Sequence, residues 1–361
     1  MKKIVSKSVN FITNRLNKLI EYNNLVTRKY FHSPHFKYNN QLIPRMNSNI
    51  IVKNTHFESL TIKSYLQNNS FNLNRRYLID SFKTEHIKFS SKFDVQIYHT
   101  GENLYNQVGV ANALTRINFP LFNSLFPYIP KSILKIPLWE PYKKHFKILN
   151  RKGTYFILTN SIPKKKSNVF ILPLFMNRYQ SHYKPLLKKE KVTQIPTKFC
   201  AFIVSNPSNI ERLEFYQKLS KYKKVDSFGK IFRNASFKAT NEVQHLSNPE
   251  IYKNYKFVIC FENSYEEEYV TEKLPNAMLG GAIPIYKGAP NVGKYFNTNS
   301  FINYDDYGSF DKMIKKIIEL DKDDEKYLEF INREWITPQN KKNIEQKEKE
   351  FEQFLDKVFK E

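Results

Sequence analysis

The stretch from Tyr255 to Gly281, YKFVICFENSYEEEYVTEKLPNAMLGG, predicts the architecture of the C-terminal half of the chain. Its apolar start, YKFVIC, is typical of a buried strand, and YVTEKLPNAMLGG indicates a helix that ends at glycine. Five carboxylates lie among the thirteen residues from Phe261 to Lys273, although the formal net charge of the chain is +24. Open α/β sheets bind ligands where a strand stops and a helix begins. The acids therefore mark a candidate binding site.

The same alternation of strands and helices continues on both sides of this stretch. FCAFIVS, from Phe199, is another apolar run, and the helix expected within 206–222 has Asn209 or Ser208 as its N-cap. AIPIYKG and SFINY indicate two more strands, and SFDKMIKKIIEL indicates a helix. Such alternation predicts an α/β fold, a parallel sheet with helices on both faces.

The length of 361 residues favours two domains. The predicted N-terminal domain, 1–190, opens with 90 polar, asparagine-rich residues that are weakly patterned; strand candidates follow at KFDVQIYHT, TYFILT and VFILPLF. We interpret the basic segment KPLLKKEKVTQIPTK, which contains two prolines, as a flexible linker. The predicted C-terminal domain covers 196–335, and an amphipathic helix closes the chain over 336–361. The apolar side of that helix carries Ile344, Phe351, Leu355 and Val358.

The N-terminal segment and the cysteines bear on the compartment. Charges interrupt the N-terminus too often for a signal peptide, and no apolar stretch approaches the ~18 residues of a membrane span. Cys200 and Cys260 lie in apolar runs, which favours buried thiols in a reducing compartment over a disulfide. We therefore expect a cytoplasmic protein. A basic N-terminal amphipathic helix leaves peripheral membrane contact open, and its apolar side carries Val5, Val9, Ile12, Leu16 and Leu19.

The charge balance, 58 Lys and Arg against 34 acids, is compatible with a nucleic-acid binder, an enzyme for an anionic substrate or a membrane-surface protein. The lysines are spread along the whole chain, and no RNP signature, zinc-finger spacing or Arg-rich tail is present, which argues against nucleic acid. The motifs G-x-G-x-x-G, G-x-x-x-x-G-K-[ST] and H-E-x-x-H are also absent. Hydride transfer and P-loop chemistry therefore have no support.

Two acidic clusters are the candidates for a divalent ion beside a diphosphate. We interpret the pair Asp305 and Asp306 as the polar end of a strand. The second cluster is interpreted as a solvated turn and consists of Asp321, Asp323 and Asp324. We therefore expect no required metal, with stimulation by Mn²⁺ left open.

A nucleotide diphosphate can instead be held by three other side chains. Glu272 lies inside the apolar stretch YVTEKL, where a carboxylate can accept two hydrogen bonds from a ribose diol. Lys273 can then meet a phosphate, and Arg212, on the preceding predicted helix, offers a bidentate fork to the other phosphate oxygens. For Glu266–Glu268 we expect a solvated acidic turn.

These segments closely resemble the α-1,3/4-fucosyltransferases, glycosyltransferase family 10. The resemblance rests on CAFIVSNPSNIERLEFYQKL, YKFVICFENSYEEEYVTEKLPNAMLGGAIPIYKGAPNV and FNTNSFINYDDY, within about 196–310, and the spacing after T-E-K is similar to that of bacterial members. Upstream, YHTGEN resembles the family's Y-T-G-E-N signature. The resemblance implies a GT-B fold, in which two Rossmann-like domains face a cleft. It also implies GDP-β-L-fucose as the donor, bound by the C-terminal domain, and an acceptor-side N-terminal domain.

The resemblance further implies roles for individual residues. Arg212 and Lys273 match the diphosphate-binding positions and Glu272 the ribose-binding glutamate, while other donor-site positions match Ser205, Asn263 and Tyr269. Glu102 matches the proposed catalytic base. His99 is the rival base, although its strand-like surroundings favour a packed histidine.

The implied reaction is transfer of L-fucose with inversion to a glycan hydroxyl, O3 of N-acetylglucosamine in an N-acetyllactosamine-like acceptor. The segment after TGEN departs from the family pattern, which leaves the acceptor open. Two alternatives stand beside this one. The first is another GT-B sugar-nucleotide transferase with a different donor or acceptor. The second is a non-catalytic basic protein that binds nucleic acid or a membrane surface.

Overall fold

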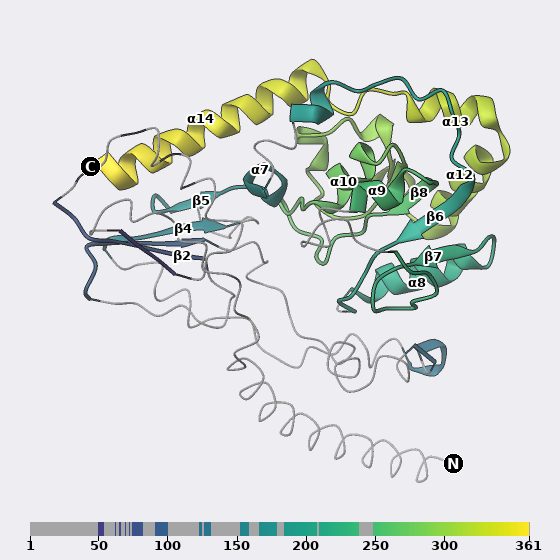
Figure 1. Cartoon of the computed structure of the whole chain (residues 1–361), viewed down its shortest axis with the longest axis horizontal. Coiled ribbons are helices and arrows are strands. Elements are labelled where there is room, and N and C mark those ends of the chain that lie inside the picture. Colours follow the sequence, from purple (N-terminus) through teal and green to yellow (C-terminus); the bar gives the residue numbers. More distant parts are fainter. Residues whose placement is uncertain are drawn as a thin grey trace, which may run out of the picture.

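The computed structural model describes residues 50–53, 62, 65, 69, 72, 74–81, 91–99, 123–124, 126–130, 152–158, 166–178, 184–207, 209–237 and 248–360 (Figure 1). The predicted N-terminal helix and Glu102 lie outside these residues. Ser208, one of the two N-cap candidates, lies outside them as well.

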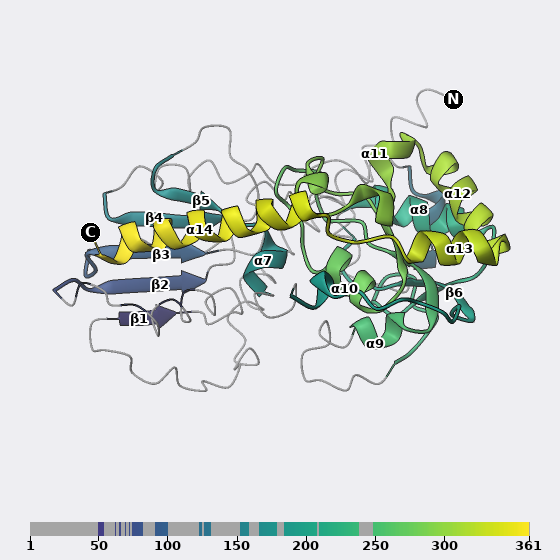
Figure 2. The ribbon, with the colours of Figure 1, turned by 90° about the horizontal axis from the view of Figure 1, so that it is seen from above.

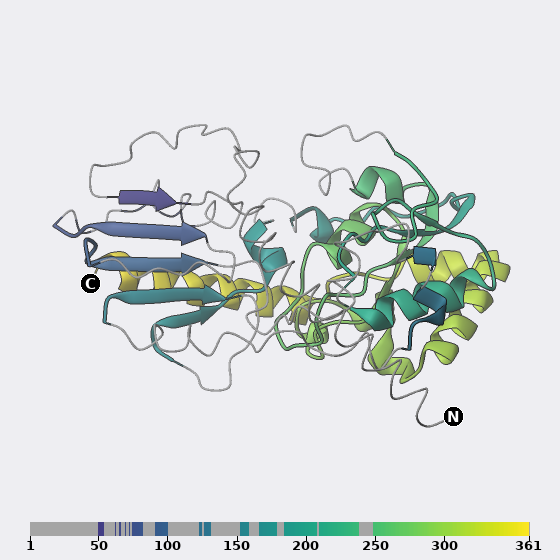
Figure 3. The same cartoon turned by 90° about the horizontal axis from the view of Figure 1, so that it is seen from below.

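The first sheet has five parallel strands in sequential order. They are β1 (Ile50–Lys53), β2 (Tyr77–Ser81), β3 (Val95–His99), β4 (Thr154–Leu158) and β5 (Val169–Ile171). Figure 3 shows them side by side. The predicted strands at KFDVQIYHT, TYFILT and VFILPLF correspond to β3, β4 and β5, whereas β1 and β2 lie in the segment that the sequence left unassigned.

The second sheet has the order β10-β9-β8-β6-β7 and is also parallel. Its strands are β6 (Lys198–Phe202), β7 (Val225–Ser227), β8 (Tyr255–Ile259), β9 (Ile283–Tyr286) and β10 (Ile302–Asn303). All were predicted except β7. From β6 the chain moves outward to β7, and it then returns to place β8 on the opposite side of β6. The topological switch point of this sheet therefore lies between β6 and β8.

Helices cover both faces of the second sheet, as predicted. Alternate strand residues supply the two cores: Cys200 and Phe202 belong to one cluster, with residues of α8, α12 and α13, whereas Ala201 belongs to the other, with residues of α9 and α10. The helix bounds are α8 (Ile210–Ser220), α9 (Asn248–Tyr252), α10 (Lys273–Leu279), α11 (Tyr304–Tyr307), α12 (Phe310–Lys322) and α13 (Asp324–Ile331). Short 3-10 turns lie at Phe126–Tyr128, Lys184–Leu187, Val292–Lys294 and Thr298–Ser300.

The last helix, α14 (Pro338–Lys360), leaves the second domain and lies across the first sheet (Figures 1 and 2). The ring of Phe170 on β5 lies 5.2 Å from that of Phe351 and 5.4 Å from that of Phe354. Near its end, Phe359 packs against Tyr77 of β2 at 5.3 Å. The predicted apolar side is confirmed, because its residues are buried: Ile344, Phe351, Leu355 and Val358.

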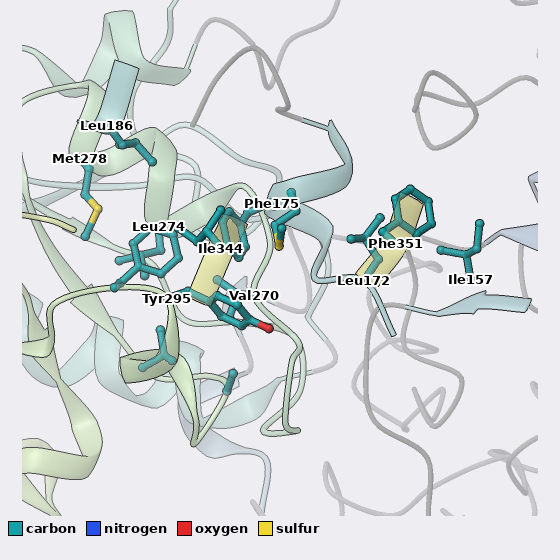
Figure 4. Close-up of a cluster of buried hydrophobic side chains, with 14 of the residues drawn as sticks. Ile157, Leu172, Phe175, Leu186, Val270, Leu274, Met278, Tyr295, Ile344 and Phe351 are labelled. Atoms are coloured by element: carbon teal, nitrogen blue, oxygen red, sulfur yellow. The ribbon is translucent and has the colours of Figure 1, made fainter. Parts of the chain in front are cut away.

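A continuous apolar core connects the two sheets. Helix α7 (Leu174–Arg178) lies between them, and its Phe175 ring is 5.5 Å from that of Tyr295 in the second domain (Figure 4). The Phe175 amide donates to the main-chain oxygen of Val270 at 3.0 Å. Figure 4 also shows Phe351 beside Leu172, in the part of this core that belongs to the first domain. The two domains therefore share buried surface rather than a polar boundary.

The segment between the domains is held against the end of α13. Lys189 Nζ donates to the main-chain oxygens of Ile331 and, at 2.6 Å, of Arg333. Val192 exchanges two hydrogen bonds with the side chain of Asn332, at 2.8 and 2.9 Å. The segment that we interpreted as a linker thus has specific partners in the C-terminal domain.

Cys200 and Cys260 are buried free thiols, in agreement with the sequence analysis. Burial raises the pKa of both thiols well above their ordinary value. Within the described part of the chain, none of the helices combines the length and the apolar character needed to span a bilayer.

Candidate functional site

A cavity of about 330 Å³ opens at the carboxyl edge of β6 and β8, the switch point of the second sheet. The segment after β6, the first turn of α8, the segment after β7, the start of α9 and the junction between β8 and α10 all contribute to its wall. The lining residues are Ile203, Val204, Ser205, Asn206, Arg212, Gly229, Asn248, Asn263, Glu272 and Lys273. Five of the seven predicted site residues therefore line one cavity: Ser205, Arg212, Asn263, Glu272 and Lys273.

Arg212 lies in the first turn of α8, where Asn209 caps the helix by accepting from the Arg212 amide at 3.2 Å. Its side chain is only 1% exposed. The guanidinium donates to the main-chain oxygens of Phe261 and Asn206 and, at 3.0 Å, to Oδ1 of Asn263.

No carboxylate of the described residues forms an ion pair with Arg212, and its buried Nε has no hydrogen-bond partner there. Burial lowers the pKa of Arg212 to about 10, so the side chain is still protonated at neutral pH. A buried cation held by neutral oxygens, beside a cavity, favours an anion as the missing partner.

Lys273 is the first residue of α10, and its ammonium group bonds to Glu262 Oε2 and Thr271 Oγ1, both at 2.8 Å. Burial alone lowers the pKa of Lys273, but the carboxylates of Glu262 and Glu272 more than offset this effect, and the pKa is raised overall. Lys273 thus enters the cavity wall as an oriented, permanently charged group.

Glu262 is the residue that the sequence analysis missed. It is fully buried, and besides Lys273 it accepts from the amide of Thr271 at 2.8 Å and from its hydroxyl at 2.7 Å. The three donor groups belong to two residues, Thr271 and Lys273, which follow Glu262 within eleven residues, so Glu262 fixes the fold of the junction between β8 and α10. The signal was present in the sequence as an acid directly after a buried strand.

Glu272 precedes the first residue of α10, yet its side chain makes no capping hydrogen bond to that helix. It lines the cavity next to Lys273. A carboxylate in this position can accept hydrogen bonds from the hydroxyl groups of a ligand, which is the chemistry expected of a ribose-binding acid.

Three further predicted residues, Asn263, Ser205 and Tyr269, differ in position. Asn263 lines the cavity and orients Arg212, as described above. Ser205 also lines it and accepts from the amide of Lys230 at 3.3 Å. Tyr269 is 1% exposed and is not among the residues of the cavity wall.

The predicted solvated turn at Glu266–Glu268 is wrong for Glu268. This residue is buried, and its φ of 66° is a backbone conformation that favours glycine. Its carboxylate accepts from Asn291, from Lys294 at 3.0 Å and from the Tyr295 hydroxyl at 2.5 Å. The segment 291–295 folds back over the turn, a contact between distant residues that the local pattern does not reveal.

The acidic clusters agree with expectation only in part. Asp305 and Asp306 lie in α11 directly after β10, and Asp305 accepts from the Tyr265 hydroxyl at 3.2 Å. Asp321 is not in a solvated turn: it lies in α12 with its side chain 3% exposed, beside Lys223 and Lys256. Among the residues that the structure describes, no group of three His, Cys, Asp or Glu side chains is placed to hold a metal.

His99, the rival base, is fully buried at the end of β3, as expected of a packed histidine. Glu102 follows three residues later, outside the described residues, and its role stays a prediction.

The chain is similar to known fucosyltransferases in sequence and in fold. Residues 193–358 match the family model described as glycosyltransferase family 10 (fucosyltransferase), C-terminal part. The chain is 36% identical over 133 residues to an alpha-(1,3)-fucosyltransferase of Helicobacter pylori, a match that covers 37% of this chain and 27% of that protein. It is 34% identical over 147 residues to 4-galactosyl-N-acetylglucosaminide 3-alpha-L-fucosyltransferase 9 of Cricetulus griseus, covering 39% of each. The matches thus span well under half the length of these relatives.

A crystal structure of an alpha1,3-fucosyltransferase with GDP-fucose is similar over most of both chains, 87% of this one and 94% of that one, with 19% identity and a TM-score of 0.53. This likeness shows the fold. The two parallel sheets with their helices are a GT-B-like arrangement of two Rossmann-like domains, closed by a C-terminal helix.

Proposed function

Because residues 193–358 match the family model of glycosyltransferase family 10, we propose that the chain transfers L-fucose from GDP-β-L-fucose to a glycan hydroxyl with inversion at the anomeric carbon. The single observation that carries this proposal is Arg212. It is a buried cation that has no carboxylate partner and no hydrogen-bond partner for its Nε among the described residues, and it lines the cavity at the switch point of a parallel sheet. A diphosphate supplies the missing negative charge.

Different site residues bind the nucleotide and stabilise the leaving group. Arg212 and Lys273 offset the negative charge that develops on the β-phosphate as the bond to fucose breaks. Both are held by neighbouring groups before a ligand arrives, so little reorganisation accompanies the reaction. Glu272 accepts from the ribose hydroxyls, and Asn263 keeps the Arg212 fork in position.

The acceptor hydroxyl attacks the anomeric carbon from the face opposite the diphosphate, through a transition state with oxocarbenium character like that of glycoside hydrolysis. One general base is sufficient, because the diphosphate leaves without protonation. Glu102 is our candidate for this base, on the resemblance of YHTGEN alone.

The relatives support the donor and the acceptor proposed here. The similar crystal structure is of an enzyme with GDP-fucose, and the name of the Cricetulus griseus relative specifies 3-linked fucose on galactosylated N-acetylglucosamine. We propose that the acceptor atom is O3 of N-acetylglucosamine in an N-acetyllactosamine-like glycan. We also propose that the protein is cytoplasmic, either free or in peripheral contact with a membrane.

A thermal-shift comparison of GDP, UDP, CDP and single-stranded RNA tests the donor proposal against the alternatives. We expect GDP to raise the melting temperature most, because anions that bind only the folded state stabilise it. Stabilisation by UDP or CDP instead would indicate another sugar-nucleotide transferase, and stabilisation by RNA alone would overturn the enzymatic proposal. A glycan array with GDP-fucose then identifies the acceptor.

Transfer should continue in excess EDTA, since Arg212 and Lys273 supply the positive charge beside the diphosphate. The measurement is the rate of fucosyl transfer with EDTA, with added Mn²⁺ and without either; a stimulation by Mn²⁺ is compatible with this prediction, because it does not make the ion a requirement. Complete and reversible loss of transfer on chelation would contradict the prediction. Asp305 and Asp306 would then be the first candidate ligands, and their Asn variants the next measurement.

A further inference from the structure

The cavity wall contains more polar groups than the diphosphate and the ribose account for. Its charged side chains are Arg212, Glu272 and Lys273. The others are neutral, and they come from the segments after β6 and β7, from the junction after β8 and from the start of α9. A nucleoside diphosphate also combines charged and neutral polar groups, because its diphosphate is charged and its base is neutral but rich in hydrogen-bonding groups.

Two of the neutral side-chain acceptors in this wall already have donors. Ser205 Oγ accepts from the amide of Lys230, and Asn263 Oδ1 accepts from Arg212. Asn248 differs from both: its Oδ1 is buried and has no hydrogen-bond partner among the described residues. A buried polar oxygen without a donor is destabilising, and native proteins rarely keep one unless a ligand or water completes it.

Close packing fixes the position of Asn248. It is the first residue of α9, which packs directly against α10: a Cβ on Gly280 at the end of α10 would lie 2.5 Å from Cβ of Tyr252. Elsewhere in the cavity wall, a Cβ on Gly229 would lie 2.0 Å from the main-chain oxygen of Val204. Helix α9 is therefore held against α10, and the segments after β6 and β7 are held against each other.

We propose that Asn248 is a specificity-determining residue whose side-chain oxygen accepts a hydrogen bond from the N–H edge of the guanine base. This inference rests on the proposed function. Guanine presents donors at N1 and at its 2-amino group, whereas adenine has an acceptor at N1, a hydrogen at C2 and its amino group at C6. An adenine bound in the same orientation would place its N1 acceptor and its C2–H against Asn248 Oδ1 and leave that oxygen without a donor. Sites built around such a bond reject analogues that lack it.

The test is titration calorimetry of the full chain with GDP, ADP and inorganic diphosphate. Wild-type protein should bind GDP more tightly than ADP. In Asn248→Ala the affinity for GDP should fall by about tenfold while the affinities for ADP and diphosphate stay unchanged, which removes the preference. Asn248→Asp keeps an acceptor and should retain the preference. Asn254→Ala, an exposed asparagine just beyond the same helix, is the matched control and should behave as wild type.

Each outcome decides between the inference and the function on which it rests. Equal weakening of GDP, ADP and diphosphate in Asn248→Ala, or an unchanged ratio of GDP to ADP affinity, would overturn the role of Asn248 and leave the nucleotide site standing. Loss of the preference in a folded Asn248→Asp variant would also overturn it. If wild-type protein binds none of the three ligands, the proposed function itself fails. Melting temperatures of all variants show which of them are folded.

Discussion

Arg212 illustrates how a buried cation is kept in place before its counter-ion is present. The main-chain oxygens of Phe261 and Asn206 and the side-chain oxygen of Asn263 accept from two of its nitrogens, and Nε has no partner in the part of the chain that the structure describes. These neutral oxygens offset only part of the cost of burying a charge. The remaining cost is lowered when an anion binds, which couples ligand binding to the stability of this edge of the sheet.

Replacing Arg212 by Ala should reduce both donor affinity and turnover, because it removes a charge-assisted interaction with the diphosphate. In a closed site that interaction contributes about 2–4 kcal/mol. Arg212→Lys should recover little, because an ammonium group cannot reproduce the bidentate geometry. Calorimetric GDP affinity and the transfer rate are the two measurements. Arg233→Ala, at an exposed arginine of the same domain, is the control. Wild-type GDP affinity in Arg212→Ala would show that the guanidinium does not touch the diphosphate.

The two glutamates of the proposed mechanism should separate binding from chemistry. Glu102→Gln cannot accept a proton near neutral pH, so transfer should drop by roughly 100-fold while GDP affinity stays near the wild-type value. Glu272→Gln should instead weaken GDP binding through the ribose. Near-normal turnover of Glu102→Gln at saturating donor would assign the base elsewhere, and loss of GDP binding in both variants alike would give Glu102 a structural role.

Sequence reasoning found the cavity residues whose chemistry is visible locally and missed those defined by distant contacts. Glu272 and Lys273 stood out because charges interrupt an apolar helix start. Glu268 did not, because its burial depends on Lys294 and Tyr295, more than 20 residues away. Asn248 has no distinguishing neighbours in the sequence at all, and only its place in the cavity wall marks it.

Among the elements, predictability followed length and apolar content. Strands β6, β8 and β9 are apolar runs between clear helices, and α8 carries an N-cap asparagine, so each was predicted. β1, with the sequence IIVK, and β7, with the sequence VDS, are too short to form a pattern. They exist because neighbouring strands offer them hydrogen-bonding edges, which is information that the local sequence does not contain.

The docking of α14 through its apolar side can be tested by a single substitution. Phe351 is 2% exposed and packs against Phe170 of the first sheet. Phe351→Ala should lower the free energy of unfolding by about 3–5 kcal/mol, because it removes a buried ring and leaves a cavity. Urea denaturation followed by circular dichroism measures the change. Lys349→Ala, exposed on the same helix, should change stability little; equal effects of the two substitutions would contradict the docking of α14 through its apolar side.

At the scale of the whole molecule, a polar contact accompanies the apolar one between α14 and the N-terminal domain. The Tyr65 hydroxyl and Lys360 both donate to Asp356. The Lys360 bond, together with that from Tyr65, holds the pKa of Asp356 below its ordinary value. A carboxylate with a lowered pKa stabilises the fold above its unfolded pKa of about 3.9, and this contribution is lost as the pH falls through the folded pKa.

Asp356→Asn should therefore be less stable than wild type near pH 5, and the difference should shrink below about pH 3. The measurement is the free energy of unfolding of both proteins at the two pH values, so that the titration of all other carboxylates cancels. A difference that is independent of pH would mean that the Asp356 charge contributes nothing to the stability of the fold.

The path of α14 also has a consequence for biosynthesis. Strands β1–β5 leave the ribosome long before the helix that covers them, and at about 5–20 residues per second the delay is roughly 10–40 s. During this interval the nascent N-terminal domain exposes the aromatic surface around Phe170 and Tyr77 to which α14 will bind. We expect that surface to recruit chaperones during translation, and any transcript truncated before Pro338 to yield an aggregating product rather than a soluble half-protein.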